Sequence, residues 1–188
     1  MAHIILASSS PRRRELLLQL GLDFDIFSPD IDETVNAEED VACYVERLAC
    51  DKAAAVFEKF PDAVIIAADT SLGIDRKILG KPESKQHAFE MWKLISGRKH
   101  HVFTGVCVRT KQEKLSIVVC TEVEFQVLSL NDMESYWDTG EPIGKAGGYA
   151  IQGIAARYIP NIIGSYTNVV GLPLHETAQL LQTVKVLN

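Results

Sequence analysis

The densest positive charge in the sequence lies where an apolar segment changes into a helical pattern. In "HIILASSSPRRRELLLQLGL", three serines, a proline and three arginines occupy residues 8–14. The first turn of a helix presents unpaired N–H groups and the positive end of its dipole, so arginines there do not stabilise the helix. Hydroxyls, N–H groups and guanidinium forks together favour phosphate. We therefore predict that Ser8, Arg12 and Arg13 bind an anion, and we interpret Arg14 as a surface residue.

Four further ionisable residues stand in contexts that packing does not readily explain. Asp69 follows the apolar run in "VIIAADT", and Lys81 lies between a glycine and a proline in "LGKPES". Lys52 lies among small residues in "CDKAAA", where a solvated lysine is the alternative, and Glu33 belongs to the loop "DIDET". Phosphoryl chemistry uses this combination, because cations hold phosphates, carboxylates hold Mg²⁺ and one base orients water.

A second polar segment, "GEPIGKAGGYAIQG", contains Lys145, Tyr149 and Gln152. Its glycines permit a close approach of the backbone to a ligand.

Composition limits the protein classes. The 188 residues carry a formal net charge of −6, with 47% hydrophobic and 23% charged residues. This balance argues against a general nucleic-acid or membrane-surface binder, so a bound polyanion should be small and held locally. No apolar run approaches the ~20 residues of a membrane span, and the first ten residues lack the basic region of a signal peptide. A cytoplasmic location is therefore expected. The four cysteines form no C-x-x-C pair and are interpreted as free buried thiols.

Helical patterns and strand patterns alternate along the first part of the chain. We expect helices at residues 11–21, 37–60, 84–98 and 129–140, and another at the end of 165–184. Ser10 and Ser129 suit N-caps, and Gly21, Gly97 and Gly140 suit helix ends.

Strands are expected at residues 3–8 and 62–75, and the segment 23–33 is expected to be a strand that breaks at Pro29 and leads into a loop. A hairpin joins 100–110 to 114–128 through "KQEK". The segment 145–159 is predicted to begin as a loop and become a strand. His100 and His101 are neighbours on a predicted strand and point to opposite faces, which argues against a shared metal ion. The expected fold is one α/β domain over residues 1–188, with a mixed sheet, flanking helices and two lobes around a cleft.

Several ordered blocks resemble the Maf family of nucleoside triphosphate pyrophosphatases over nearly the whole chain. They are "LASSSPRRRELL", the Lys52 helix, "AADTSL" with "LGKP", "LISGRKHHVFTGV", "GEPIGKAGGYAIQG" and "GSYTNVVGLPLHET". The resemblance implies the mixed α/β fold shared with inosine triphosphatases. It also implies hydrolysis of a nucleoside triphosphate to the monophosphate and pyrophosphate with a divalent metal. Ser9 and Ser71 differ from the usual residues but change no charge.

The resemblance also implies roles for individual residues. Asp69 matches the family's proton acceptor, and the cleft residues are matched by Ser8, Arg13, Glu33, Lys52 and Lys81. Arg12, Thr70 and Gln152 match the positions that mark the branch acting on dTTP and UTP. A side-chain amide such as that of Gln152 offers both a donor and an acceptor, as a pyrimidine edge requires.

The expected mechanism divides these groups by charge. Arg13, Lys52 and Lys81 neutralise the phosphate chain, and Lys145 assists in binding. Glu33 and Asp69 hold Mg²⁺ or Mn²⁺, while Asp69 also orients the attacking water. Three alternatives remain at this stage: a 7-methyl-GTP preference, as in the sister branch, a nucleotide-binding regulator of septum formation, and, more weakly, tRNA binding. The apolar C-terminal part could support a homodimer, and stable binding to membranes or nucleic acids is not expected.

Overall fold

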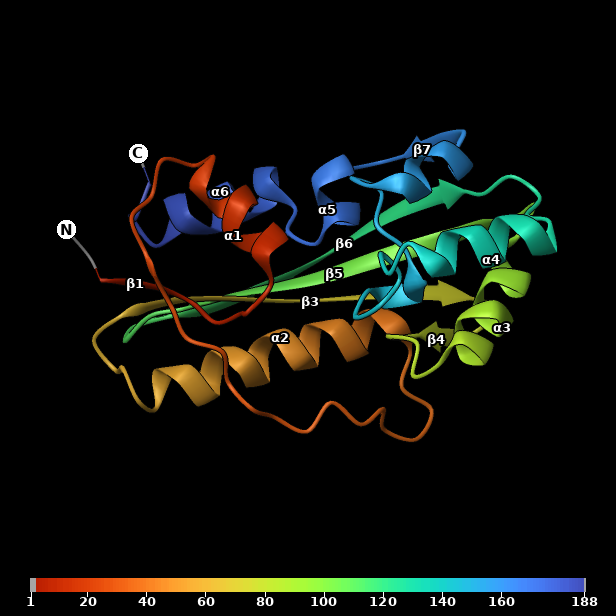
Figure 1. Ribbon diagram of the computed structural model, residues 1–188. Coiled ribbons are helices and arrows are strands. Elements are labelled where there is room, and N and C mark those ends of the chain that lie inside the picture. The colour runs from red at the N-terminus through yellow and green to blue at the C-terminus, as the bar shows by residue number, and fades with distance from the viewer. Residues whose placement is uncertain (1–2, 188) are drawn as a thin grey trace.

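The computed structural model describes residues 3–187 and is built around a seven-stranded mixed sheet (Figure 1). The strand order is β2-β1-β3-β5-β6-β7, and β4 pairs with β3. β1 is parallel to β2 and β3, and the remaining pairs are antiparallel. The strands span Ile4–Leu6 (β1), Asp25–Ile26 (β2), Val64–Ile74 (β3), Lys77–Leu79 (β4), Lys99–Arg109 (β5), Lys114–Glu124 (β6) and Asn161–Ile163 (β7).

The first four α-helices begin at side chains that cap their first N–H groups. Ser10 accepts a hydrogen bond from the N–H of Arg13, and Asp40, Ser84 and Ser129 cap the next three helices in the same way. The α-helices span Pro11–Leu18 (α1), Val41–Phe57 (α2), Lys85–Ile95 (α3), Leu130–Asp138 (α4), Tyr166–Val170 (α5) and Leu174–Thr183 (α6), and the 3₁₀ helices Ala146–Gly148 (η1) and Ile154–Tyr158 (η2).

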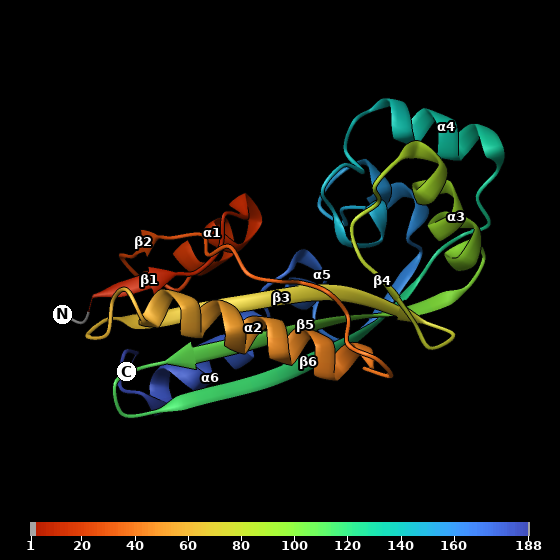
Figure 2. The same ribbon diagram turned by 90° about the horizontal axis from the view of Figure 1, so that it is seen from below.

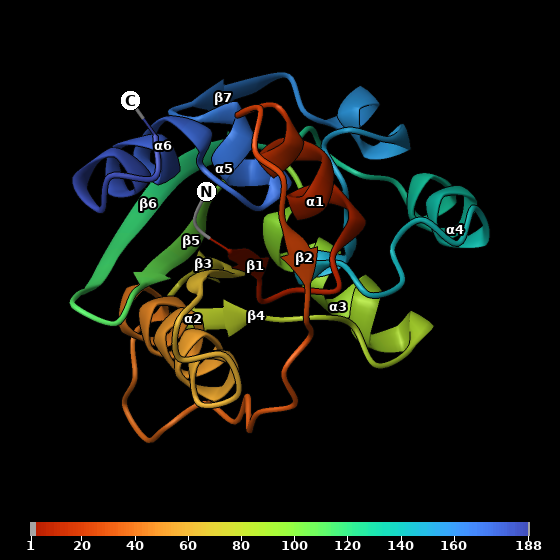
Figure 3. The same cartoon turned by 90° about the vertical axis from the view of Figure 1, so that its left-hand side faces the viewer.

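The helices form layers on both faces of the sheet. α2 covers one face, and α1, α5 and α6 cover the other (Figures 1 and 3). The far ends of β3, β5 and β6 carry α3 and α4 (Figure 2). These helices pack with η1 and η2 around Trp92. These two parts are the two lobes that the sequence predicted, and the long strands run through both of them.

One edge of β3 is interrupted, and this interruption creates the opening of the site. β1 pairs with β3 only as far as Ile66, and β4 pairs with it only from Leu72. Residues 67–71 therefore have a strand on one side alone, namely β5. Ser8 follows the end of β1 and Lys81 follows the end of β4, so both flank the interruption. Because side chains alternate along a strand, Asp69 and Thr70 point to opposite faces of it.

Several sequence predictions need correction. The segment 145–159 forms η1 and η2 instead of a strand, and β7 follows it. The strand expected before Pro29 is shorter than its pattern suggested, since only Asp25 and Ile26 pair in the sheet. The strand expected at residues 62–75 is confirmed as β3, in which pairing with β4 and β5 continues the strand past Asp69 to Ile74. Among the cysteines, only Cys107 is buried, whereas Cys43 and Cys120 are exposed.

The remaining predictions of local structure are confirmed. The helices start or stop at the expected serines and glycines, and the hairpin of β5 and β6 has its turn at the expected place. His100 is buried and His101 is exposed, as their opposite directions require. No described helix is long and apolar enough to cross a membrane.

Candidate active site

A cleft of about 330 Å³ opens at the interrupted edge of β3. Its walls come from the β1–α1 turn, α2, β3 and the segments around residues 144–152 and 169–171. All ten site residues predicted from the sequence line it: Ser8, Arg12, Arg13, Glu33, Lys52, Asp69, Thr70, Lys81, Lys145 and Gln152. The fold therefore brings together groups that lie up to 144 positions apart in the chain.

Lys52 lies at the centre of the charged side of the cleft. Its Nζ is 2.6 Å from Oδ1 of Asp69 and 2.7 Å from Oε1 of Glu33. The side chains of Lys52 and Asp69 are both only 11% exposed, so the alternative of a solvated lysine is wrong. Gly105 pairs with Asp69 across the sheet, and a Cβ at Gly105 would overlap the carbonyl oxygen of Val45 in α2. The missing side chain thus lets α2 approach the sheet closely enough to bring Lys52 to Asp69.

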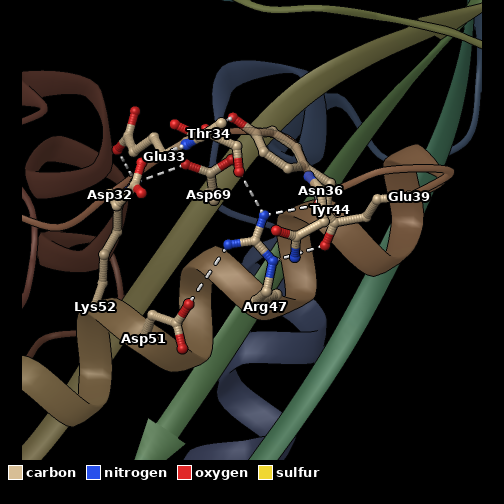
Figure 4. A network of polar contacts seen from close by, with 10 residues as sticks. All are labelled: Asp32, Glu33, Thr34, Asn36, Glu39, Tyr44, Arg47, Asp51, Lys52 and Asp69. Carbon is tan, nitrogen blue, oxygen red and sulfur yellow. Dashed lines mark hydrogen bonds and ion pairs between the residues drawn. The ribbon is translucent and has the colours of Figure 1, made fainter.

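Glu33 reaches Lys52 from a loop that α2 holds in place (Figure 4). Arg47 of α2 donates from Nε and Nη2 to the carboxylate of Glu39, both at 2.7 Å, and from Nη2 to the carbonyl of Thr34. Tyr44 donates its hydroxyl proton to the carbonyl of Glu33 at 2.8 Å. Burial favours the neutral form of Glu33, but the hydrogen bond and charge of Lys52 outweigh it and lower the pKa of Glu33.

Arg13 is fixed by three different segments. Nε donates to the carbonyl of Gly171 at 2.8 Å, Nη2 to the hydroxyl of Thr70 at 3.0 Å and Nη1 to the hydroxyl of Ser8 at 3.4 Å. A guanidinium has five N–H groups, so two remain for a ligand. Burial lowers the pKa of Arg13, and the Asp69 carboxylate opposes this shift. Arg13 is therefore a pre-positioned anion-binding group.

Positive charge dominates the lining of the cleft although the chain as a whole is acidic. The lining contains five cationic and two anionic residues. Burial lowers the pKa of Arg12, and burial together with the charge of Arg12 lowers that of Lys145. Lys81 is mostly exposed and lies 3.9 Å from Glu33. Closely spaced cations without equal counter-charge form a site suited to a polyanion.

The opposite wall of the cleft is formed by the glycine-rich segment. Gly147 has a φ of 64° and donates its N–H to the carbonyl of Gly80, next to Lys81. Its own carbonyl accepts from the indole N–H of Trp92 at 3.2 Å. Tyr149 is buried and its hydroxyl lies 2.7 Å from Nε2 of His100, whereas Gln152 is exposed at the cleft.

The carboxylates of Glu33 and Asp69 are the groups of the cleft that could bind a divalent cation. Mg²⁺ commonly binds through one or two carboxylates and takes its other ligands from phosphates and water. Glu33 and Asp69 supply two carboxylates that converge on one ammonium group. Within residues 3–187, no group of three or more His, Cys, Asp or Glu side chains could hold a metal. This donor set fits a cation that arrives with a phosphate chain.

Sequence reasoning missed the residues that support Thr70. The Oγ1 atoms of Thr70 and Thr104 are 2.9 Å apart, and Thr104 donates to the carbonyl of Asn168 at 3.0 Å. Thr104 has one hydroxyl proton, so Thr70 must donate to Thr104 while it accepts from Arg13. Asn168 is fully buried and donates to the carbonyl of Val102. An asparagine within the apolar stretch "YTNVV" was the available signal for this network.

The sequence is similar throughout its length to proteins of known name. A family model described as "Maf-like protein" matches residues 3–184. A dTTP/UTP pyrophosphatase of Acinetobacter baylyi is 64% identical over 183 residues, which cover 97% of this chain and all of that protein. A dTTP/UTP pyrophosphatase of Vibrio parahaemolyticus is 47% identical over 180 residues, and this alignment covers 95% of this chain and 95% of that protein.

Solved structures support the fold at low sequence identity. A HAM1 protein from Coxiella burnetii superposes with a TM-score of 0.59 at 15% identity and covers 98% of both chains. The Ham1 protein of Staphylococcus aureus gives a TM-score of 0.58 at 12% identity, covering 97% of this chain and 100% of that one. The fold is thus the predicted mixed α/β fold, and the chain belongs to the Maf family.

Proposed function

We propose that this protein is a nucleoside triphosphate pyrophosphatase that hydrolyses dTTP and UTP to the monophosphate and pyrophosphate. The observation that carries the proposal is the contact of one buried ammonium, Lys52 Nζ, with both Asp69 and Glu33 in a cleft lined mainly by cations. The names of the relatives at 64% and 47% identity support the substrate choice.

The phosphate chain is assigned to the wall formed by α1, α2 and the end of β4. The two free N–H groups of Arg13 and the helix N-terminus bind phosphate oxygens, and Ser8 contributes its hydroxyl. Lys52 and Lys81 neutralise further charge. Because these cations already face the cleft, little reorganisation is needed when charge develops in the transition state.

Asp69 is assigned to the attacking water. Oδ1 accepts from Lys52, which leaves Oδ2 to orient a water molecule and take its proton as the water attacks the α-phosphorus. Lys52 holds Asp69 in one position through the 2.6 Å contact between Nζ and Oδ1. A divalent cation bound with the substrate, held by Glu33 and Asp69, would neutralise phosphate charge and lower the pKa of its bound water.

Base selection is assigned to Arg12, Thr70 and Gln152, all of which line the cleft. The amide of Gln152 can donate to a carbonyl of the pyrimidine and accept from its N3–H. The structure adds a restriction on Thr70, whose proton is donated to Thr104 and which therefore offers a ligand only an acceptor.

The decisive experiment measures pyrophosphate release from NTPs, dNTPs and 7-methyl-GTP, with Mg²⁺ and with Mn²⁺. The wild-type protein is compared with Asp69→Asn and with the control Asp62→Asn, which changes an exposed aspartate paired with Lys111. We expect turnover of dTTP and UTP, a loss of at least ~10²-fold in kcat for Asp69→Asn, and wild-type rates for the control.

Two results would overturn parts of the proposal. Preference for 7-methyl-GTP would keep the chemistry but reject the assignment of base selection. Tight nucleotide binding without turnover in the wild type would favour the regulator hypothesis. The cytoplasmic location, the homodimer and a role in cell division stay predictions.

A further inference from the structure

Glu141 lies just beyond the end of α4. Its side chain accepts three hydrogen bonds, one from a side chain of α4 and two from the backbone of η2. Oε2 accepts from the backbone N–H of Ile154 at 2.8 Å. Oε1 accepts from the backbone N–H of Ala155 at 3.1 Å and from the hydroxyl of Tyr136 at 2.6 Å. The carboxylate thus satisfies the first N–H groups of η2, a short helix whose cap residue makes no side-chain hydrogen bond.

Tyr136 extends this arrangement to the other side of the same segment. Its hydroxyl donates to Glu141 and accepts from the N–H of Ala150 at 3.3 Å. The ring of Tyr136 is buried and packs against Trp92, with ring centroids 5.3 Å apart. This packing fixes the position of the hydroxyl group. Burial and the hydrogen bond to Glu141 raise the pKa of Tyr136, which keeps it protonated as the donor.

Gly153 provides the space that the carboxylate occupies. A Cβ at this position would overlap Oε2 of Glu141. Its φ of −117° is accessible to other residues, so the left-handed region is not the reason for glycine here. The absence of a side chain is explained by the close approach of Glu141.

The backbone N–H groups that Tyr136 and Glu141 bind lie on both sides of Gln152 in the chain. Ala150 is held on one side of it, and Ile154 and Ala155 are held on the other. The Glu141 charge also acts on Arg12 and Lys145 at the cleft. Burial disfavours the ionised form of Glu141, but its hydrogen bonds outweigh burial and lower its pKa, so it is a carboxylate at neutral pH.

We infer that Glu141 and Tyr136 form a clamp that positions residues 150–155, and with them Gln152, for recognition of the nucleobase. Both are positioning residues, since neither lines the cleft. This inference rests on the proposed function for its substrate. It predicts that loss of the clamp changes the choice of base while hydrolysis by the opposite wall continues.

The test compares Glu141→Gln and Tyr136→Phe with the control Asp138→Asn. The control removes the same charge three residues earlier, from a side chain 72% exposed whose ion pair is with Lys85 at 3.8 Å. A glutamine cannot accept at both positions of the carboxylate, and phenylalanine keeps the packed ring. For both clamp variants we expect a roughly tenfold rise in KM for dTTP, a fall in the dTTP-to-CTP ratio of kcat/KM, and a kcat within about threefold of wild type.

The variant Gly153→Ala distinguishes the effect of the position of the Glu141 carboxylate from the effect of its charge. It displaces the carboxylate of Glu141 but leaves its charge in the molecule. We expect the same change in the dTTP-to-CTP ratio as in Glu141→Gln. A normal ratio in Gly153→Ala would overturn the positioning role, because only the charge would then matter.

Amide hydrogen exchange tests the clamp without catalysis. We expect faster exchange at Ile154 and Ala155 in Glu141→Gln, and at Ala150 in Tyr136→Phe, with unchanged exchange in the control. Unchanged exchange in the clamp variants would overturn the inference. So would equal losses of kcat on every nucleotide with a constant ratio, which is the result of a merely structural role. A wild type without turnover would instead reject the proposed function, and the exchange data would still decide whether the clamp exists.

Discussion

The two walls of the cleft are built from different kinds of structure. On one wall, the charged groups are carried by α1, α2 and β3, and Lys52 and Asp69 are fixed between a helix and the sheet. On the other wall, Lys145 and Gln152 belong to residues 144–155, a segment of turns and short 3₁₀ helices. Rigid elements hold groups more accurately than turns do. Arg13, Lys52 and Asp69, which are proposed to act on the phosphates, lie on α1, α2 and β3. Of the residues proposed for base selection, Arg12 and Thr70 lie on α1 and β3, whereas Gln152 lies in the turn segment, where sequence changes leave the sheet intact.

The largest expected effect removes the central cation of the first wall. Lys52→Met leaves the facing carboxylates of Asp69 and Glu33 without their shared partner. We expect a loss of at least ~10²-fold in kcat and a fall of about 3 kcal/mol in the free energy of unfolding at pH 7. Kinetics and chemical denaturation measure both, with Lys111→Met in the exposed hairpin turn as the control. Wild-type turnover in Lys52→Met would contradict the proposal that the wall of α1, α2 and β3 carries the groups needed for hydrolysis.

An intermediate effect is expected on the second wall. Gln152→Ala removes the amide but no charge, so the dTTP-to-CTP ratio of kcat/KM should fall about tenfold while kcat changes less than threefold. Gln112→Ala, in the exposed turn between β5 and β6, is the matched control. A uniform loss of kcat for all nucleotides would show that this wall also takes part in hydrolysis.

The smallest effect concerns the loop that carries Glu33. The hydrogen bonds from Arg47 lower the pKa of Glu39 from 4.5 to about 2. A carboxylate whose pKa is lower in the folded than in the unfolded state stabilises the fold at any pH above its unfolded-state pKa. This contribution is lost as the pH falls through its folded-state pKa. Arg47→Met should therefore be less stable than wild type above pH 4.5, and the difference should disappear as the pH falls towards 2. Denaturant midpoints across this range measure it, and a difference independent of pH would contradict the assignment.

Local signals predicted most of the elements correctly. Ser10 with Pro11, and Ser129 before its apolar pattern, predicted where α1 and α4 begin, because capping depends on residues within one turn. The hairpin was predictable from two β-rich runs around a polar turn. The segment 145–159 was predicted wrongly because its backbone conformation depends on distant partners. Gly147 bonds to Gly80, and Ile154 and Ala155 bond to Glu141.

The sequence by itself determined which groups the site contains. The arginines at the start of α1, the lone Asp69 after an apolar run and the Lys52 helix indicated phosphoryl chemistry from residue type alone, and the ordered blocks indicated the family. Their spatial relation was decided only by the tertiary structure. Pairing of β1 and β4 with different parts of β3 leaves its edge open at residues 67–71, and packing of α2 across Gly105 brings Lys52 to Asp69. Such contacts join residues far apart in the chain, and their energies depend on distance and burial, which local sequence patterns do not contain.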